Sequence, residues 1–424
     1  MRIFIAGFAV LVTLLLAGIA VGDTVQYNVI DLGNPLGGTG VPYGIGNLGS
    51  SINNLDWVAG EADLPGSTTM HAELWLYGVP IDFGTLGGPD SAVAWPNRNN
   101  NGVIVGISET ASLQPRGEEW SCAVAIFYSA PPDGHVCRGF VWNNGVMAEL
   151  PTLGGDNGFA TGVNNRGHIV GWAENTVLDS TCNANNQVLQ FEAVLWKQEN
   201  GQYQPQELPP YAGDLDGAAT AINQKGQVVG ISGLCGGAVG GETAEHMVMW
   251  RHDVVVRIMP TLGGTYWNTP MDINNRGDVV GFSDLPGDAV GSPNFHAFFW
   301  SRKPFTCDGE TTTGTCDLGT LQGDVISEAL GVNDQGEVVG ISLGSSPYGQ
   351  AFIWQNGVIT NLNSLVVPGT SLILTDAQDI NDNGVITGQA YDPSSGVMQA
   401  FMAIPTHDND RNNAAYSSRK HRGQ

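Results

Sequence analysis

The sequence predicts an all-β fold, a seven-bladed β-propeller of four-stranded meander blades. Three observations support this prediction: an excess of glycine, a motif that recurs seven times, and a spare strand near the start of the chain. Glycine accounts for 59 of the 424 residues, roughly twice its usual share. Only 13% of the residues are charged, whereas 42% are hydrophobic. These values argue against a helical bundle, which avoids glycine, and against a disordered chain, which lacks apolar residues.

The repeated motif is clearest in residues 163–171, Val-Asn-Asn-Arg-Gly-His-Ile-Val-Gly. Its closing glycine recurs about every 55 residues, and such self-similarity indicates a repeat architecture. An asparagine always stands seven positions before that glycine. The glycines are Gly60, Gly106, Gly171, Gly230, Gly281, Gly340 and Gly388. The asparagines are Asn53, Asn99, Asn164, Asn223, Asn274, Asn333 and Asn381.

Each repeat predicts four strands, called a to d here. Strand a ends at the asparagine, and a type I turn with Asn first and usually Gly fourth leads into strand b, which ends at the repeated glycine. Strand c, such as residues 296–300, is apolar on both faces and mostly ends in Trp, so neighbouring sheets should cover both faces. Strand d ends in a Leu-Gly or Leu-Pro element. We expect the repeated glycine to permit close backbone approach between neighbouring blades.

The two ends of the chain indicate how the ring closes. The seventh repeat stops near Pro405 after its strand c, and residues 27–33 form a strand of the d type at the other end. If this N-terminal strand completes the last blade, no sheet edge stays exposed. The propeller is therefore expected to span residues 23–405.

Three elements recur in fixed order: Leu-Gly-Thr-Leu-Gly-Gly, Ile-Asn-Asn-x-Gly-x-Val-Val-Gly and His-Ala-Phe-Phe-Trp. Together they resemble the bacterial HAF-repeat proteins, and the resemblance covers nearly all of residues 27–405. Only residues 296–298 spell His-Ala-Phe in full, whereas residues 71–73 and 350–352 depart from it. The resemblance implies an extracellular bacterial repeat protein and brings no established activity with it.

The N-terminus predicts export from the cytoplasm. Arg2 precedes an apolar run over residues 3–21 that closes on small residues, which is typical of a secretory signal peptide over residues 1–22. An uncleaved membrane anchor is the alternative, because the run is long enough to span a bilayer. Residues 406–424 are expected to form a disordered basic tail. We therefore expect a secreted, extracellular or periplasmic protein without a membrane partner after cleavage.

The formal charge of −25 argues against nucleic acid and against anionic membrane surfaces as partners. No cofactor is expected, and we expect a monomer. Six cysteines suit an oxidising compartment. Cys122 and Cys137 lie in one insertion, and Cys307 and Cys316 bracket a short loop, which leaves Cys182 and Cys235 to pair between adjacent blades.

Two motifs match known sites, and in both cases a structural role is favoured. Residues 340–344 match the Gly-x-Ser-x-Gly pattern of serine hydrolases, but they end a strand b and no helix follows as that motif requires. Residues 379–384 match the opening of a calcium loop, but Ala390 stands where the bidentate acid is needed. No catalytic residue and no metal site is predicted.

Strand b carries an acid three residues after its glycine in four blades, and strand c begins with a polar residue in all seven. These positions are expected to face each other across a hairpin, as Asp63 with His71, Glu109 with Arg138, Glu174 with Glu192 and Asp284 with His296. Either the pairs satisfy hydrogen bonds at the sheet rim, or they belong to a ligand-binding face.

The b–c and d–a connections should emerge together, and they contain the long insertions and several aromatic residues. Aromatic rings over acidic or amide groups suit carbohydrate or peptide recognition, although packing between blades is the alternative for each ring. The sequence thus predicts a binding or scaffolding protein for a glycan or protein ligand. A propeller hydrolase or lyase acting on extracellular polysaccharide, with carboxylates at the tunnel mouth, is the alternative, although the innermost strands of the repeat offer Asn rather than a cluster of acids and His. The predicted binding residues are Asp63, Glu109, Trp120, Glu174, Tyr211, Tyr266, Trp267 and Asp284.

Overall fold

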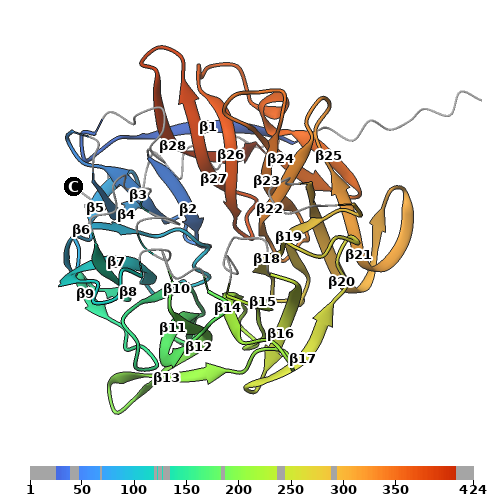
Figure 1. Ribbon diagram of the computed structural model, residues 1–424. Helices are drawn as coiled ribbons and strands as arrows, with labels where there is room; N and C mark the ends of the chain where they lie inside the picture. Colours follow the sequence, from blue (N-terminus) through green and yellow to red (C-terminus); the bar gives the residue numbers. More distant parts are fainter. Residues whose placement is uncertain are drawn as a thin grey trace, which may run out of the picture.

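The computed structural model describes residues 25–38, 47–66, 69–118, 122, 127, 134–182, 187–235, 244–287 and 294–406. In these residues, 28 strands form seven four-stranded antiparallel sheets. The sheets stand around a central axis as the blades of a propeller (Figure 1). The predicted fold class is confirmed. No helix among the described residues is long and apolar enough to cross a membrane.

Six blades each take four consecutive strands, which occupy positions a to d from the axis outwards. Blade 1 contains β2 (Leu48–Ile52), β3 (Val58–Asp63), β4 (Met70–Leu76) and β5 (Val79–Asp82). Blade 2 contains β6 (Gly87–Ala92), β7 (Val103–Leu113), β8 (His135–Asn143) and β9 (Val146–Glu149). Blade 3 contains β10 (Gly158–Val163), β11 (Ile169–Leu178), β12 (Leu189–Glu199) and β13 (Gln202–Leu208).

The remaining blades follow the same plan. Blade 4 contains β14 (Asp216–Ile222), β15 (Val228–Gly233), β16 (His246–Arg251) and β17 (Val254–Met259). Blade 5 contains β18 (Asn268–Ile273), β19 (Val279–Asp284), β20 (Phe295–Cys307) and β21 (Glu310–Gly319). Blade 6 contains β22 (Ile326–Val332), β23 (Val338–Leu343), β24 (Gln350–Gln355) and β25 (Val358–Asn361), followed by the 3-10 turn η2 (Leu362–Leu365).

The seventh blade combines both ends of the described chain. Its strands are β26 (Ile373–Ile380), β27 (Ile386–Asp392), β28 (Val397–Thr406) and β1 (Gln26–Gly33). β1 pairs antiparallel with β28, with Tyr27 opposite Pro405 and Ile30 opposite Met402. The N-terminal strand thus takes the d position in this sheet, the place that the sequence leaves vacant. The expected signal peptide lies outside the described residues, as does the expected tail apart from Thr406, which ends β28.

The hydrophobic core lies in layers between neighbouring blades, and in blades 3 and 4 the tryptophan at the end of strand c also bonds to the preceding blade. Trp196 in blade 3 and Trp250 in blade 4 are fully buried. Each indole Nε1 donates a hydrogen bond of 2.7 Å to the preceding blade, Trp196 to the carbonyl of Pro151 and Trp250 to that of Pro209. Both acceptors follow the leucine that ends strand d, so this polar link accounts for the pairing of Trp with a Leu-Pro element.

The glycine that ends the repeated motif is required within its own blade. Strand a has a bulge before the asparagine, and two residues before this bulge a backbone carbonyl oxygen points at the glycine of strand b. A Cβ on Gly171 would lie 1.9 Å from the carbonyl oxygen of Phe159, and one on Gly60 would lie 1.8 Å from that of Leu48. The close approach is therefore to strand a of the same blade, and the expected contact between neighbouring blades is wrong on this point.

The repeated asparagine joins each blade to the next. The Oδ1 atom of Asn164 accepts the backbone N–H groups of Arg166 and His168, which closes the predicted turn. Its Nδ2 atom donates 3.1 Å to the carbonyl oxygen of Asn223 in the following blade. The same link recurs in every blade and returns to the start: Asn53 to Asn99, Asn164, Asn223, Asn274, Asn333, Asn381 and back to Asn53.

A second circle of hydrogen bonds runs beside the first. The residue after each asparagine donates its backbone N–H to the side-chain oxygen of its equivalent in the next blade. Because both circles consist of groups from the a–b turns, they place seven polar side chains around the axis at one end. These side chains are Asn54, Asn100, Asn165, Gln224, Asn275, Asp334 and Asp382. We call this end of the propeller the turn face.

The three predicted disulfides are confirmed: Cys122 with Cys137, Cys182 with Cys235, and Cys307 with Cys316. The Cys182–Cys235 bond joins the b–c connections of blades 3 and 4, as expected for adjacent blades. Disulfides persist in oxidising compartments, and their presence is compatible with the expected export.

Candidate functional site

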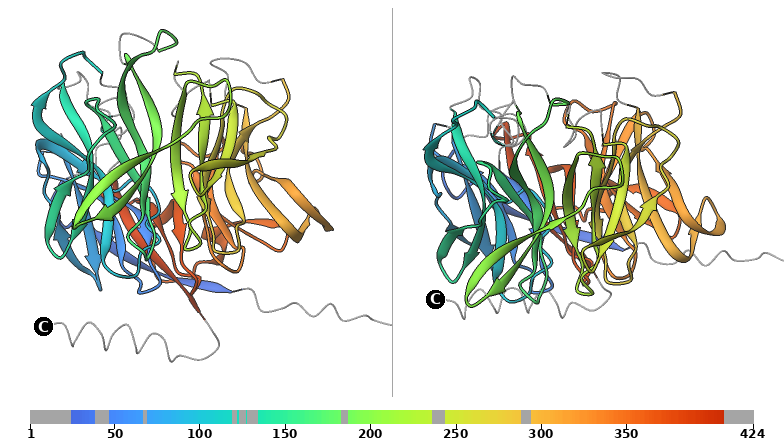
Figure 2. Two further views of the ribbon diagram at one scale, coloured as in Figure 1. Left: turned by 90° about the horizontal axis from the view of Figure 1, so that it is seen from below. Right: turned by 60° about the horizontal axis from the view of Figure 1, so that its bottom comes forward.

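The b–c and d–a connections lie together at the end opposite the turn face, and we call this end the loop face. In both views of Figure 2, the described part of the β11–β12 connection rises at this end, away from the a–b turns. Seven of the eight binding residues predicted from the sequence are described, and all seven lie at the loop face. Trp120 alone lies outside the described residues.

The predicted pairing across the b–c hairpin is wrong by one residue. His71 lies opposite Ala62, and His296 lies opposite Ser283, so the acids of strand b point elsewhere. The polar residue of strand c instead contacts an acid on strand d. His71 Nδ1 lies 2.9 Å from Asp82, and His296 Nδ1 lies 2.9 Å from Asp317.

The same shift applies to the other two predicted pairs. Arg138 lies opposite Ser108, and its Nε atom lies 3.2 Å from Glu149 on strand d. Glu192 lies opposite Ala173, and its neighbour on strand d is Glu207. Burial raises the pKa of Glu192 to about 8, and the charge of Glu207 adds to this rise.

The strand b acids anchor the d–a loops of the loop face. Asp63, Glu109, Glu174 and Asp284 are all buried. Glu109 accepts the backbone N–H of Asp90 at 3.0 Å, and Asp284 accepts that of Trp267 at 2.9 Å. The second glycine of the Leu-Gly-Gly element packs on the acid, since a Cβ on Gly264 would lie 2.3 Å from the Cβ of Asp284. These buried carboxylates therefore hold the backbone of the d–a loops in place, and they are not themselves exposed to a ligand.

The predicted aromatic residues divide into exposed and packed rings. Tyr211 and Tyr266 are exposed, at 38% and 37%. Tyr211 lies over His246, with 4.7 Å between the ring centroids, and His246 Nδ1 lies 2.9 Å from Asp214. Trp267 packs edge-on against Phe282 and Phe295, which fits the structural alternative for this ring.

The loop face has a further aromatic pair that the sequence did not single out. Tyr348 in blade 6 and Tyr391 in blade 7 stack with 4.6 Å between centroids and 17° between planes, and Tyr348 is 44% exposed. Beside them, Asp392 accepts hydrogen bonds from the hydroxyls of Ser394 and Ser395. Tyr391 occupies the position that carries an acid in four other blades, and this departure from the repeat was the available signal.

The axis near the turn face has a charged cluster that the sequence also did not reveal. Arg98 precedes Asn99 in blade 2, where six other blades have Ile or Val. In blade 3, Phe159 on strand a pairs with Trp172, the residue after the repeated Gly171, and Phe159 stands five positions before Asn164. In blade 2, the equivalent residue is Ala92, which pairs with Ile107 after the repeated Gly106, and Ala92 stands seven positions before Asn99. Two extra residues in blade 2 thus separate its strand a from the turn, and Arg98 reaches the axis.

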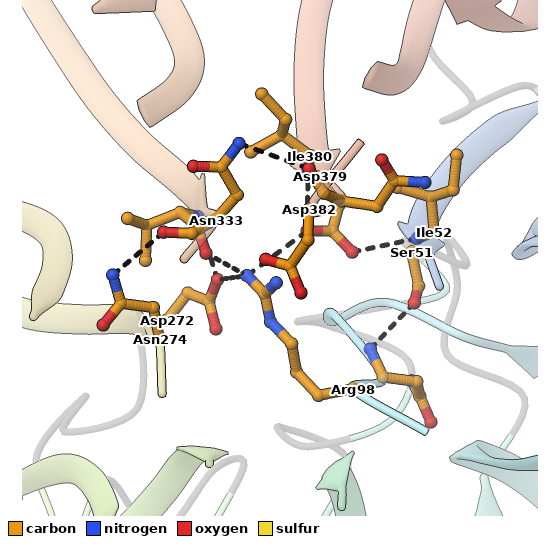
Figure 3. A network of polar contacts seen from close by, with 12 residues as sticks. Ser51, Ile52, Arg98, Asp272, Asn274, Asn333, Asp379, Ile380 and Asp382 are labelled. Carbon is orange, nitrogen blue, oxygen red and sulfur yellow. Dashed lines mark hydrogen bonds and ion pairs between the residues drawn. The ribbon is translucent and has the colours of Figure 1, made fainter. Parts of the chain in front are cut away.

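The Arg98 guanidinium pairs with carboxylates from two distant blades (Figure 3). It donates to Asp272 of blade 5 and to the carbonyl of Val332, and it lies 3.6 Å from Asp379 of blade 7. Asp272 and Asp379 also accept the backbone N–H groups of Val332 and Ile52, each at 2.9 Å. Burial raises the pKa of Asp379 to about 7, while Arg98 opposes the rise.

A polar cavity of about 90 Å³ adjoins this cluster. Its lining consists of Arg98 and the seven side chains of the turn face, from Asn54 to Asp382, with Ile52, Asn53 and Asn274. The volume suits a few water molecules or one small polar ligand. Asp379, the first residue of the calcium-like segment, is held against Arg98 here, so that segment serves the packing of the axis.

The expectation that the innermost strands offer Asn rather than acids is wrong. Besides Asp272 and Asp379, Glu328 on β22 and Asp376 on β26 lie on innermost strands of neighbouring blades, and both are partly exposed. Burial raises the pKa of Glu328 to about 7, with a contribution from the charge of Asp376, and raises that of Asp376 to about 6. These acids lie outside the repeated Asn-to-Gly segment, so the repeat itself does not reveal them.

No protein-family model matches the chain, and no curated protein matches it. Three solved structures illustrate its weak structural likeness. A gluconolactonase from Xanthomonas campestris is 11% identical, with a TM-score of 0.32 over 64% of this chain and 82% of that one. A putative oxidoreductase (glucose dehydrogenase) from Thermus thermophilus is 9% identical, with a TM-score of 0.33 over 89% and 100%. A Trypanosoma rangeli sialidase is 10% identical, with a TM-score of 0.33 over 72% and 52%. Likeness at this level carries no argument about activity.

Proposed function

We propose that this protein is a secreted binding or scaffolding propeller of the HAF-repeat type that engages a glycan through its loop face. The observation that carries the proposal is the set of exposed tyrosine rings on that face. Tyr211, Tyr266 and Tyr348 come from three separate connections, and Tyr348 stacks on the partly exposed Tyr391 of β27. Sugar rings bind by laying their C–H faces on aromatic rings while their hydroxyls bond to nearby polar groups.

The surroundings of the tyrosines supply those polar groups. Asp392 with Ser394 and Ser395 lies next to the stacked pair. On the blade 6 side, Asp324 accepts bonds from Ser345 and from Gln350. Tyr211 has His246 and Asp214 beside it. Carboxylates and hydroxyls next to aromatic rings suit a neutral polyhydroxy ligand better than an anionic one, because the chain is strongly acidic.

A glycan array with the mature protein tests this proposal. We expect binding to one class of glycan and a loss of about thirtyfold in affinity when Tyr348 and Tyr391 are both changed to Ala, since each ring contributes about 1 kcal/mol. The matched control is Tyr77→Ala, in the turn between β4 and β5 on the opposite face. Unchanged binding by the double variant would refute the role of the loop face. Binding of the wild type to a protein in place of glycans would redirect the proposal to a protein ligand.

One observation favours the alternative of a hydrolase or lyase acting on extracellular polysaccharide. Glu328 and Asp376 form a carboxyl pair on innermost strands, with raised pKa values of about 7 and 6. A pair in which one member holds a proton near neutral pH can act as general acid and base. Release of reducing ends from a bound polysaccharide, abolished by Glu328→Gln, would establish this activity. Binding without turnover would leave the binding function.

A further inference from the structure

The loop face contains an acidic cluster between blades 2 and 3 that no predicted motif includes. Glu118 comes from the β7–β8 insertion, Asp156 from the connection between β9 and β10, and Glu174 from β11. One ligand atom of each residue lies within 4.8 Å of the other two. Three parts of the chain that are distant in sequence thus bring their carboxyl groups to one point.

Glu118 provides a second and independent observation. Its side chain is completely buried, and its Oε1 atom accepts the backbone N–H groups of Leu189 and Val188 at 2.6 and 3.1 Å. Its Oε2 atom is also buried and has no hydrogen-bond partner among the described residues. A buried carboxylate oxygen without a partner carries a large desolvation cost, so a cation or a proton should accompany it.

The charge around the cluster is not balanced by the protein. Arg116 pairs with Asp156, and both side chains are partly open to solvent, at 44% and 28%. Glu174 is held by neutral donors only: the backbone N–H groups of Asp156 and Asn157 and the amides of Asn157 and Gln187. Three carboxylates against one guanidinium leave two negative charges, which equals the charge of a divalent cation.

We propose that Glu118, Asp156 and Glu174 bind a calcium ion that fastens the blade 2 insertion onto blade 3. Hard oxygen ligands select Ca²⁺ or Mg²⁺ over softer metals. Ca²⁺ accepts irregular geometry and six to eight oxygens, whereas Mg²⁺ requires near-ideal octahedral geometry. A site built from three separate segments with fixed backbone contacts suits the less demanding ion.

Calorimetric titration of the full mature protein with CaCl₂, after EDTA treatment and desalting, tests the proposal. We expect one ion per chain with a Kd on the order of 0.1–1 mM, the range of extracellular calcium modules. Glu118→Gln should weaken this binding at least tenfold. The matched control is Glu149→Gln, a half-exposed acid of blade 2 that pairs with Arg138 and is not one of the three proposed ligands. This control should bind calcium as the wild type does.

Thermal unfolding provides a second readout that is independent of any glycan. CaCl₂ should raise the melting temperature of the wild type and of Glu149→Gln, and it should leave that of Glu118→Gln unchanged. If Glu118→Gln does not fold, Asp156→Asn decides the matter, because Asp156 is partly exposed and its change leaves the core intact. The proposal is overturned if the wild type shows no calcium binding up to about 5 mM, or if Glu118→Gln and Asp156→Asn both bind like the wild type.

Discussion

The side chain of Asn381 donates a hydrogen bond of 2.9 Å to the backbone carbonyl of Asn53, 328 residues earlier in the chain. This bond is the last link in the circle of asparagines, and it joins blade 7 to blade 1. The same turn segments make the neighbouring contact, where the N–H of Asp382 donates to the side chain of Asn54 at 2.9 Å. The repeated asparagine thus has two tasks, since its oxygen closes a local turn and its nitrogen reaches the next blade.

Changing the asparagine to aspartate should separate these two tasks. Asn99→Asp keeps the oxygen that accepts the N–H groups of Asn101 and Val103. It replaces the donor to the Asn164 carbonyl with an oxygen, so we expect a loss of about 1–3 kcal/mol in the free energy of unfolding. Denaturant unfolding measures this loss. Asn144→Asp, in the exposed turn after β8, is the control and should change stability little; equal stability of both variants would contradict the role of the ring.

Removal of β1 should open the propeller. A chain that begins at Asn34 lacks the strand that pairs with β28 and lacks the buried Tyr27. The exposed edge of β28 would then be free to pair with other chains. We expect a markedly lower melting temperature and aggregation in size-exclusion chromatography. If the shortened chain stays monomeric with an unchanged melting temperature, β1 does not hold the ring closed.

Glu73 is expected to destabilise the folded protein, so the substitution Glu73→Leu should raise the free energy of unfolding. This residue stands on β4 where the other blades have Phe or Val, and neither of its buried carboxyl oxygens has a partner among the described residues. Burial raises the pKa of Glu73 from 4.5 to about 8, with a smaller rise from Asp82.

Because the pKa is higher in the folded state, the contribution of Glu73 to stability is greatest below pH 4.5 and falls as the pH rises towards 8. At pH 8 we expect the free energy of unfolding of Glu73→Leu to exceed that of the wild type by about 2–4 kcal/mol. At pH 4 we expect a much smaller difference. Urea unfolding at both pH values measures the difference. A gain that is the same at both pH values would mean that ionisation of Glu73 does not matter.

Arg98 should be essential at neutral pH because it neutralises Asp272 and Asp379. Arg98→Met leaves both carboxylates buried, with side-chain exposures of 0% and 1%, and without their counter-charge, so we expect a loss of about 3–5 kcal/mol at pH 7. Without the guanidinium the pKa of Asp379 should rise further, so that lower pH restores part of the stability.

A triple variant provides the control for Arg98. If Asp272→Asn and Asp379→Asn are added to Arg98→Met, none of the three buried charges of this cluster remains, and most of the loss at pH 7 should be recovered. Chemical unfolding between pH 5 and 8 compares the three proteins. Failure of the triple variant to recover would show that Arg98 acts through packing.

Whether a contact could be predicted from the sequence depended on how far apart the two residues lie along the chain. The turn at Asn164 and the strand after it could be predicted because their contacts lie within four residues. The disulfide between Cys182 and Cys235 could be predicted from the blade order and the other cysteines. The partner of His71 could not, because a shift of one residue in the hairpin register moves its ring from Asp63 to Asp82.

The candidate site shows the same division. Tyr211 and Tyr266 were found from their place in the d–a connections, whereas the stack of Tyr348 on Tyr391 joins the β23–β24 connection of blade 6 to β27 of blade 7. Glu174 was found as an acid of strand b, but the sequence does not show that Glu118 and Asp156 meet it.

By itself, the sequence determined the seven blades, the positions of their strands and the repeated glycine within each strand b. These features arise from local rules, because turn geometry and alternating side chains repeat with the chain. Only the tertiary structure decided that seven asparagines form a closed circle, that two extra residues bring Arg98 to the axis, and which carboxylates converge. Those outcomes depend on contacts between residues of different blades that lie up to 328 positions apart in the chain. The spacing of residues within one repeat does not reveal such contacts.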